Sequence, residues 1–356
     1  MSARFLLCLL VTAGMLASEA ACADVRVEAG DLLGVVQGTD RILHIVPQTE
    51  QVYDFSPRQG SGPNRLFQPN GIAIDPDGTV FVTNASGELI SIDPSTGAQS
   101  VVRAFDILFG DFGPVDIGAA PRSIDISDYK ASPSDRRDLY VLSADGIRRI
   151  DRAAGSLSSE ILVAPDATIA NAIGLSIADD ATGPSSAWVA TTTEAALYDF
   201  VGGLPSTYSL GATVGGIDFR GTASLGTLIY SRSFGFANSG NGVFLLLGPL
   251  STGGSFFYPS AVATTPPSQP LVIYTAQLTS PPQIVAAAPS GSDYVQTPIV
   301  LGGESGSITA MAVSPAALPE LGFGAGAFSA CFALAALRAR RAPRPRAAPR
   351  PAPART

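Results

Sequence analysis

Short apolar runs separated by turn residues recur along most of the chain. The segment at 71–74 reads Gly-Ile-Ala-Ile, in which a small residue is followed by an aliphatic residue, any residue, and a second apolar residue. The same motif returns at 123–126, 174–177, 216–219 and 310–313, and a degenerate copy, Ala-Val-Ala-Thr, lies at 261–264. Self-similarity at intervals of several tens of residues is typical of a repeat architecture.

Each copy of the motif is followed by further apolar runs, as expected for strands joined by turns. We predict second strands at 80–84, 139–143, 187–192, 228–233 and 271–276. Third strands are predicted at 88–93, 147–152, 196–200, 243–247 and 283–285, and fourth strands at 100–102, 161–163, 207–210, 255–258 and 298–301. Three segments do not fit the repeat and are predicted to be loop insertions that could carry a binding surface: 57–68, 104–120 and 234–241.

The two ends of the repeat complete one another. The last copy of the motif, at 310–313, has no further strand after it, whereas strands predicted at 33–36, 42–46 and 52–55 precede the first copy. Pairing these strands with the last copy closes a ring and leaves no large sheet edge exposed. The sequence therefore predicts an all-β fold over residues 24–315, a six-bladed β-propeller closed by N- and C-terminal strands, with seven blades as the alternative.

The composition agrees with a turn-rich β structure. Of 356 residues, 37 are Gly and 28 are Pro, and only 15% are charged, a balance that favours short strands and many turns over helices. The three cysteines, Cys8, Cys22 and Cys331, all lie near the ends of the chain. We therefore expect neither a disulfide nor a thiolate site in the body of the protein.

The N-terminus has the pattern of a secretory signal peptide over residues 1–23. Arg4 precedes an apolar run at 5–16, and Ala21-Cys22-Ala23 forms an A-x-A cleavage site. We predict that signal peptidase cleaves before Asp24 and that the protein is exported.

The C-terminus has the pattern of a membrane anchor over residues 316–341. An uncharged apolar stretch at 321–337, at the short limit for a transmembrane helix, is followed by Arg338, Arg340 and Arg341. Arginines directly after a span hold that end in the cytoplasm, so the propeller is expected outside it, held initially at the inner membrane. Residues 342–356, rich in Pro and Arg, are predicted to be a disordered tail.

Together with Pro319 and Glu320, this tail resembles the PEP-CTERM sorting signals of Gram-negative bacteria, which an exosortase recognises. Leu321 stands where the second proline of that motif is found. The resemblance implies sorting of the exported protein to the cell envelope or the exterior by an exosortase-like enzyme. A plain membrane anchor is the alternative.

The net charge of −8 is unevenly distributed along the chain. Seven arginines follow residue 337, so the body is more acidic than the chain as a whole. Because an acidic surface repels polyanions, nucleic acid is not expected as a partner. An envelope protein or a polysaccharide is the expected ligand.

The stretch PNGIAIDPDGTVFVTNASGELISIDPSTG, which begins at Pro69, resembles a blade of NHL-repeat and gluconolactonase-like (senescence-marker-protein-like) propellers. Gluconolactonase-like propellers bind a divalent cation at their central axis through Glu, Asn and Asp of the inner strands. The resemblance implies Asn70 as a metal ligand, with Asn171 and Asp218 near the axis, and Ca or Zn as the metal. The slots equivalent to Asn70 in other blades supply no carboxylate: Arg122, Ile173, Gly215 and Thr309.

Residues suited to catalysis are few, and no catalytic residue is assigned. His44, the only histidine, lies between Leu43 and Ile45 on a predicted strand, where it should point away from the apolar face. Asp75 and Asp77 are interpreted as a turn between strands, because Asp-Gly favours tight turns and the further acids of an EF-hand loop are missing. The leading hypothesis is a non-enzymatic binding scaffold without a cofactor. The alternative is a gluconolactonase-like, metal-dependent lactone hydrolase.

Overall fold

The computed structural model divides the chain into two units, Met1–Leu321 and Gly322–Thr356, and all residues that it describes lie in the first. The predicted signal peptide, the sorting motif and the apolar stretch at 321–337 lie outside the described residues. No helix in the described part of the chain is long and apolar enough to cross a membrane. The described ranges are 27–56, 65–94, 97–106, 110–127, 137–152, 156–180, 183–210, 213–220, 227–232, 235–240, 243–246, 259–266, 269–278, 282–290, 293–301 and 306–315.

The strands of these ranges form five four-stranded sheets and one six-stranded sheet. The first two sheets along the chain are β4 (Pro69–Ile74), β5 (Val80–Asn84), β6 (Leu89–Ile92), β7 (Gln99–Val101), and β10 (Ser123–Ile126), β11 (Leu139–Ser143), β12 (Gly146–Asp151), β13 (Ser156–Val163), β8 (Arg103–Asp106), β9 (Gly110–Pro114). The next two are β14 (Gly174–Asp180), β15 (Gly183–Ala190), β16 (Glu194–Asp199), β17 (Ser206–Ser209), and β18 (Val214–Arg220), β19 (Thr227–Arg232), β20 (Gly235–Gly240), β21 (Val243–Leu246). The last two are β22 (Pro259–Thr264), β23 (Ile273–Gln277), β24 (Gln283–Ser290), β25 (Asp293–Val300), and β26 (Ser307–Val313), β1 (Leu32–Gln37), β2 (Arg41–Val46), β3 (Gln51–Ser56).

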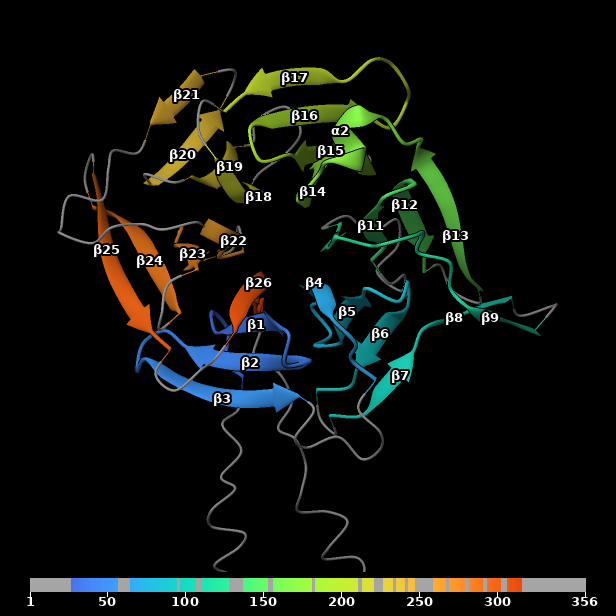
Figure 1. Ribbon diagram of the computed structural model, residues 1–356, viewed down its shortest axis with the longest axis horizontal. Coiled ribbons are helices and arrows are strands. Elements are labelled where there is room, and N and C mark those ends of the chain that lie inside the picture. The colour runs from blue at the N-terminus through green and yellow to red at the C-terminus, as the bar shows by residue number, and fades with distance from the viewer. Residues whose placement is uncertain are drawn as a thin grey trace, which may run out of the picture. The chain divides into compact units, whose positions relative to one another are not determined.

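The first strand of each sheet contacts the first strands of two other sheets. β4 contacts β10, β10 contacts β14, β14 contacts β18, β18 contacts β22, β22 contacts β26, and β26 contacts β4. These six strands form a closed ring, and the other strands of each sheet follow outwards (Figure 1). Sheets arranged in this way around an axis are the blades of a propeller, so the prediction of an all-β propeller is confirmed.

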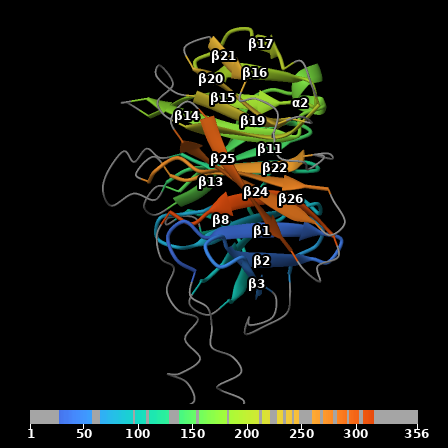
Figure 2. The ribbon, with the colours of Figure 1, turned by 90° about the vertical axis from the view of Figure 1, so that its left-hand side faces the viewer.

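The N- and C-terminal strands share one blade, as the sequence predicted. β1 pairs antiparallel with β26, with Leu32 opposite Val313, and it lies between β26 and β2 (Figure 2). At the end of this pairing, Gly30 N donates to Ser314 O over 2.9 Å, and Ser314 N donates to Asp31 O over 2.8 Å. The ring is therefore closed by a β-ladder between the two ends of the chain.

The first motif residue is small because the blades converge at the axis. A Cβ atom on Gly216 would lie 2.8 Å from Val262 N of the next blade, and one on Gly71 would lie 3.0 Å from Ile124 N. The apolar residues of the motif pack between neighbouring blades. One such cluster joins Val35 and Ile42 to apolar side chains of the β4 blade, and the propeller core consists of a series of interblade layers of this kind.

Two predicted loops are strands. The segment predicted as an insertion at 234–241 contains β20, which pairs along its length with β19. β21 is therefore the fourth strand of this blade rather than the third, and the fourth strand predicted at 255–258 lies outside the described residues. Gly, Ser and Asn dominate β20, and its place in the sheet comes from backbone pairing that such a composition does not reveal.

The segment at 104–120, also predicted to be a loop insertion, contributes to the strands β8 and β9, which pair with each other. β8 also pairs with β13, with Ser156 opposite Asp106 and Leu157 opposite Phe105. The connection that leaves the β4 blade thus extends the outer edge of the next blade. The segment lacks the motif because it belongs to no inner strand.

Candidate functional site in the axial cavity

The ring of inner strands encloses a cavity on its axis with a volume of about 230 Å³. All six inner strands line it. The residues that the sequence placed in equivalent slots line it together: Asn70, Arg122, Ile173, Gly215 and Thr309. These equivalent positions of the blades therefore lie together at the axis, as predicted.

An innermost strand has no neighbouring strand on its axial side. Asp75, Thr265 and Ser314 donate their backbone N–H groups outwards into their own blades. Because antiparallel ladders alternate, the N–H groups of the residues just before them, such as Ile74 and Val313, face the axis instead. A buried N–H group without an acceptor is destabilising, so these positions need a partner.

On three successive blades the third motif residue supplies this acceptor to the next blade. The three bonds, each between neighbouring blades, are Ile177 N to Asp125 Oδ2 at 2.7 Å, Phe219 N to Ser176 Oγ at 2.9 Å, and Thr264 N to Asp218 Oδ2 at 2.7 Å. We call Asp125, Ser176 and Asp218 the axial acceptors. The sequence motif treated their position as open to any residue, so the sequence analysis missed this role for Asp125 and Ser176.

The axial acceptors are also joined to one another. Ser176 Oγ lies 3.2 Å from Asp125 Oδ2 and 3.4 Å from Asp218 Oδ1, and Thr264 Oγ1 donates to Asp218 Oδ2 over 2.8 Å. The serine hydroxyl has one proton and can donate it to only one of the two carboxylates at a time. One side of the cavity is therefore a continuous polar chain from β10 to β22.

Asp218 is the perturbed acid of this chain. Burial raises its pKa to about 6, and hydrogen bonds from Thr264, Phe219 and Ser176 oppose that rise without cancelling it. The carboxyl group therefore changes protonation state close to neutral pH. A titratable group of this kind in a cavity is a candidate for ligand binding or proton transfer.

The other side of the ring has alanine at the third motif position. Ala73, Ala263 and Ala312 stand on β4, β22 and β26, and we call them the axial alanines. On the blade after each axial alanine, one N–H group stands where an axial acceptor would bond. For Ala73 this group is Ile126 N, which donates to Asp125 Oδ1 over 2.8 Å. Among the described residues no side chain accepts a hydrogen bond from Val313 N or Ile74 N, the two groups that follow Ala263 and Ala312. The cavity thus has a carboxylate side and a side with available N–H donors.

The three predicted metal ligands do not converge. Asn70 and Asp218 both line the cavity, whereas Asn171 is exposed at the C-cap of α2 (Ala167–Ala170) and donates from Nδ2 to Ala167 O over 2.8 Å. Asn70 Nδ2 donates to Pro121 O over 3.0 Å. In the described ranges no group of three or more His, Cys, Asp or Glu side chains is placed to hold a metal ion.

Arg122, in the slot equivalent to Asn70, holds two blades together. Its guanidinium donates to the carbonyl oxygens of Ile169, Ala170 and Ala172 at 3.4, 2.7 and 3.1 Å. These carbonyls lie at the C-terminal end of α2, where a cation is electrostatically favoured. Arg122 therefore fixes the entry to β14 at one end of the cavity.

Asp75 and Asp77 have different roles. Asp77 Oδ1 accepts from Thr79 N over 2.9 Å, which confirms the predicted turn. Asp75 forms a buried ion pair with Arg152 of the next blade, with NH1 2.7 Å from Oδ2, and the Arg152 guanidinium lies 4.6 Å from the centre of the Phe81 ring. No local signal in the sequence links Asp75 to Arg152, which follows it by 77 residues.

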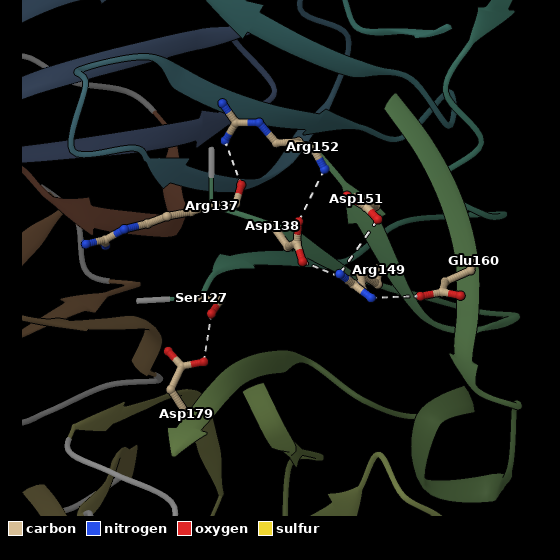
Figure 3. Close-up of polar contacts among 8 residues, drawn as sticks. All are labelled: Ser127, Arg137, Asp138, Arg149, Asp151, Arg152, Glu160 and Asp179. Atoms are coloured by element: carbon tan, nitrogen blue, oxygen red, sulfur yellow. Dashed lines mark hydrogen bonds and ion pairs between the residues drawn. The ribbon is translucent and has the colours of Figure 1, made fainter. Parts of the chain in front are cut away.

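Arg152 also belongs to a polar network within the β10 blade (Figure 3). Its NH1 group donates to Arg137 O over 3.0 Å, and its backbone N donates to Asp138 Oδ1 over 3.2 Å. Arg149 forms ion pairs with Asp138, Asp151 and Glu160 on the same blade. Nearby, Ser127 Oγ donates to Asp179 Oδ1 over 2.7 Å, which links the β10 and β14 blades beside the cavity.

His44 is not directed out of the apolar face as expected. It lies on β2, and its side chain is 2% exposed with Nε2 2.8 Å from Asp31 Oδ2. Asp31 Oδ2 also accepts from Glu28 N over 2.8 Å. The buried carboxylate offers His44 a hydrogen-bond partner, so the strand can place this residue inside. His44 is part of the closing blade and does not line the axial cavity.

Comparisons with known proteins show no family for this chain. No protein-family model matches the chain, and no curated protein matches its sequence. A solved protein of unknown function from Bacteroides caccae is similar, with a TM-score of 0.50 and 11% identity over 80% of this chain and 98% of that chain.

Two further solved structures are similar at lower scores. YCF48 bound to D1 peptide is 12% identical over 79% of this chain and 86% of that chain, with a TM-score of 0.46. The Cps50 (Swd1) β-propeller domain of Myceliophteria thermophila is 11% identical over 82% and 90%, with a TM-score of 0.47. At such identities, similarity is informative about the fold alone.

Proposed function

We propose that this chain is an exported β-propeller that acts as a binding scaffold at the cell envelope and presents the β8–β9 hairpin to a partner protein. The observation that carries the proposal is the position of this hairpin. It extends the outer edge of one blade and lies at the periphery of the ring (Figure 1).

The hairpin exposes aromatic side chains on an open sheet edge. Phe105 and Phe112 are 42% and 63% exposed, and Ile161 on the neighbouring β13 is 52% exposed. β9 is the last strand of its sheet, so its outer edge pairs with no strand of the described chain. Arg103 and Asp111 form an exposed ion pair across the hairpin, with Nε 2.6 Å from Oδ2.

An open edge beside exposed aromatic residues suits an extended polypeptide better than a glycan. An added strand obtains main-chain hydrogen bonds from the edge, and its side chains find apolar anchors in the phenylalanines. Natural sheet edges are usually blocked by charge or covered, because an exposed apolar edge promotes association. In β9, Pro114 limits the pairing to the strand's first residues, which favours a short partner segment over open-ended aggregation.

Export and sorting are inferred from the ends of the chain. The signal-peptide pattern at 1–23 and the tail that begins at Pro319 both support delivery to the envelope. The acidic body is compatible with a partner that carries basic residues.

Site-specific photocrosslinking tests the proposal. A photoreactive phenylalanine at position 112 of the full chain, expressed in its own host, should give one discrete adduct that protease removes. The matched control is position 204, because Leu204 is 97% exposed on a different blade connection. Equal adducts at both positions, or none at position 112, would contradict the proposal. An adduct removed by glycosidase but not by protease would identify a polysaccharide partner instead.

The alternative is metal-dependent lactone hydrolysis at the axis, and one observation favours it. Asn70 and Asp218, which the gluconolactonase-like resemblance implied as metal ligands, do line the same cavity. Asn70 Nδ2 donates to Pro121 O, and Asp218 Oδ2 accepts from Thr264 N. In the described ranges no third acidic, histidine or cysteine side chain is placed with Asp218 to complete a metal site, so the scaffold is the better-supported function.

A further inference from the structure

The asymmetry of the axial cavity points to a ligand with two opposite charges. On one side, Asp218 Oδ2 is held by Thr264 N and Oγ1 of β22, while Oδ1 lies 3.4 Å from Ser176 Oγ. The backbone N–H group of Phe219 also bonds to this carboxyl group. On the next two strands of the ring, β26 and β4, the N–H groups of Val313 and Ile74 face the axis beside Ala263 and Ala312. We propose that this cavity binds a small zwitterion of the α-amino-acid class.

The protein itself shows how such N–H groups are satisfied. At the equivalent level of the ring, carboxylates of Asp125 and Asp218 accept from the N–H groups of Ile177 and Thr264, both at 2.7 Å. On β22 and β26 the corresponding residues are Ala263 and Ala312, which have no carboxylate. The N–H groups of Val313 and Ile74 therefore face the cavity without this acceptor. The carboxylate of a ligand reproduces the missing group and accepts from Val313 N and Ile74 N. Charge-assisted bonds of this kind are the stronger class.

The ammonium group of the same ligand reaches the acid. Asp218 belongs to β18, and its carboxyl group is bonded to Thr264 of β22. β22 contacts β26, and β26 contacts β4. The carboxyl group therefore lies beside the first of three neighbouring strands, and the two N–H donors lie on the other two. Groups attached to one α-carbon can therefore contact both. The two oxygens of a carboxylate together accept about four hydrogen bonds, so Asp218 Oδ1, 3.4 Å from Ser176 Oγ, can also accept from an ammonium group.

The charges that line the cavity favour a cation on the side of Asp218. The other charged groups that line the cavity are Asp125, Asp179, Arg122 and Arg137, and Asp125 and Asp179 reinforce the preference for a cation on that side.

The first test is on the ligand. The full chain is melted with pools of free amino acids, and binding by positive members is measured by calorimetry, because a ligand of the native state raises Tm by mass action. The matched compounds are the N-acetyl amino acid and the corresponding amine, each of which lacks one charge. We expect at least a tenfold loss of affinity for both. No binding by any amino acid, which would leave only water in the cavity, or equal binding of the N-acetyl compound, would overturn the proposal.

The second test is on the protein. Asp218→Asn should abolish binding, and Ala312→Asp should do the same by providing an internal acceptor for Ile74 N. Asp77→Asn is the control, because Asp77 is exposed and does not line the cavity. Circular dichroism and Tm show whether each variant is folded. If folded Ala312→Asp and Asp218→Asn bind the amino acid as the unaltered chain does, the assignment of the site is wrong. The hairpin crosslink at position 112 is independent of both variants.

Discussion

Arg152 and Asp75 form a buried ion pair between two neighbouring blades, with 2.7 Å between NH1 and Oδ2 and both side chains 3% exposed. The pair sits where the turn after β4 meets the end of β12. Taking charges out of water is costly, and the cost is compensated here by mutual attraction, a backbone carbonyl and an aromatic ring. This contact gives a turn residue of one blade a structural role in the next.

Asp75→Ala should destabilise the propeller strongly. Removing one partner of a buried pair leaves an uncompensated charge, which costs about 3–5 kcal/mol in the free energy of unfolding. Urea unfolding of the variant measures the loss. Asp77→Ala is the control, because Asp77 is exposed and bonds only within its turn, and it should cost about 1 kcal/mol or less. Similar losses in the two variants would show that the ion pair contributes little.

Asp218 should make stability decrease as the pH rises from about 4 to about 6. Its pKa is raised by burial from 3.8 to about 6, so the folded state binds the proton more tightly than the unfolded state in this interval. The contribution of this group to the free energy of unfolding is fully present below pH 3.8. It is lost as the pH rises through about 6, and the total loss is roughly 3 kcal/mol.

The measurement is urea unfolding at several pH values, compared between the unaltered chain and Asp218→Asn. The asparagine keeps an acceptor for Thr264 N but does not titrate in this range. The difference in unfolding free energy between the two chains should therefore change by about that amount between pH 4 and pH 7. A constant difference would mean that Asp218 has an ordinary pKa.

Gly216→Ala should destabilise the ring at the axis. The new Cβ atom would lie 2.8 Å from Val262 N and 3.2 Å from Ala261 Cα, both backbone atoms of the next blade. Overpacking against backbone typically costs about 1–3 kcal/mol. Gly174→Ala is the matched control at the same motif position, since its nearest contact is 3.3 Å from a side-chain atom of Ile217. Thermal melts should rank Gly216→Ala as the less stable, and the reverse order would contradict the packing argument.

The ends of the chain predict two processing events. N-terminal sequencing of the exported protein should begin at Asp24. Replacing Pro319 and Glu320 by alanine should prevent exosortase-type processing and leave the protein in the membrane fraction, whereas deletion of 316–356 should release it. Unchanged processing of the alanine variant in its native host would favour a plain anchor.

An axial metal remains a separate prediction. Melts of the full chain with calcium, with zinc and with a chelator should differ if the cavity binds a divalent cation, and Asn70→Ala should remove the difference. Superimposable curves for the three conditions would eliminate the metal site and with it the lactone hydrolase. The amino-acid site would be unaffected, because Asn70 has no part in it.

The repeat in the sequence was enough to predict the propeller. Motif copies from Gly71 to Ala310 mark the inner strands, and the strands left over at the N-terminus identified the partner of the last copy. These features are visible because they depend on local periodicity and turn residues, which act between near neighbours in the chain. The strand β20 and the hairpin β8–β9 were missed, since their pairing depends on backbone edges supplied by distant segments.

The sequence by itself determined that the chain repeats, where its inner strands lie and how its ends meet. Only the tertiary structure decided what the third motif residues do. Asp125, Ser176 and Asp218 bond to N–H groups of the next blade, 43 to 52 residues away, and Ala263 and Ala312 leave two such groups facing the cavity. No local pattern distinguishes these positions, because the need for an acceptor arises only when strands with unpaired axial edges are brought together in a ring.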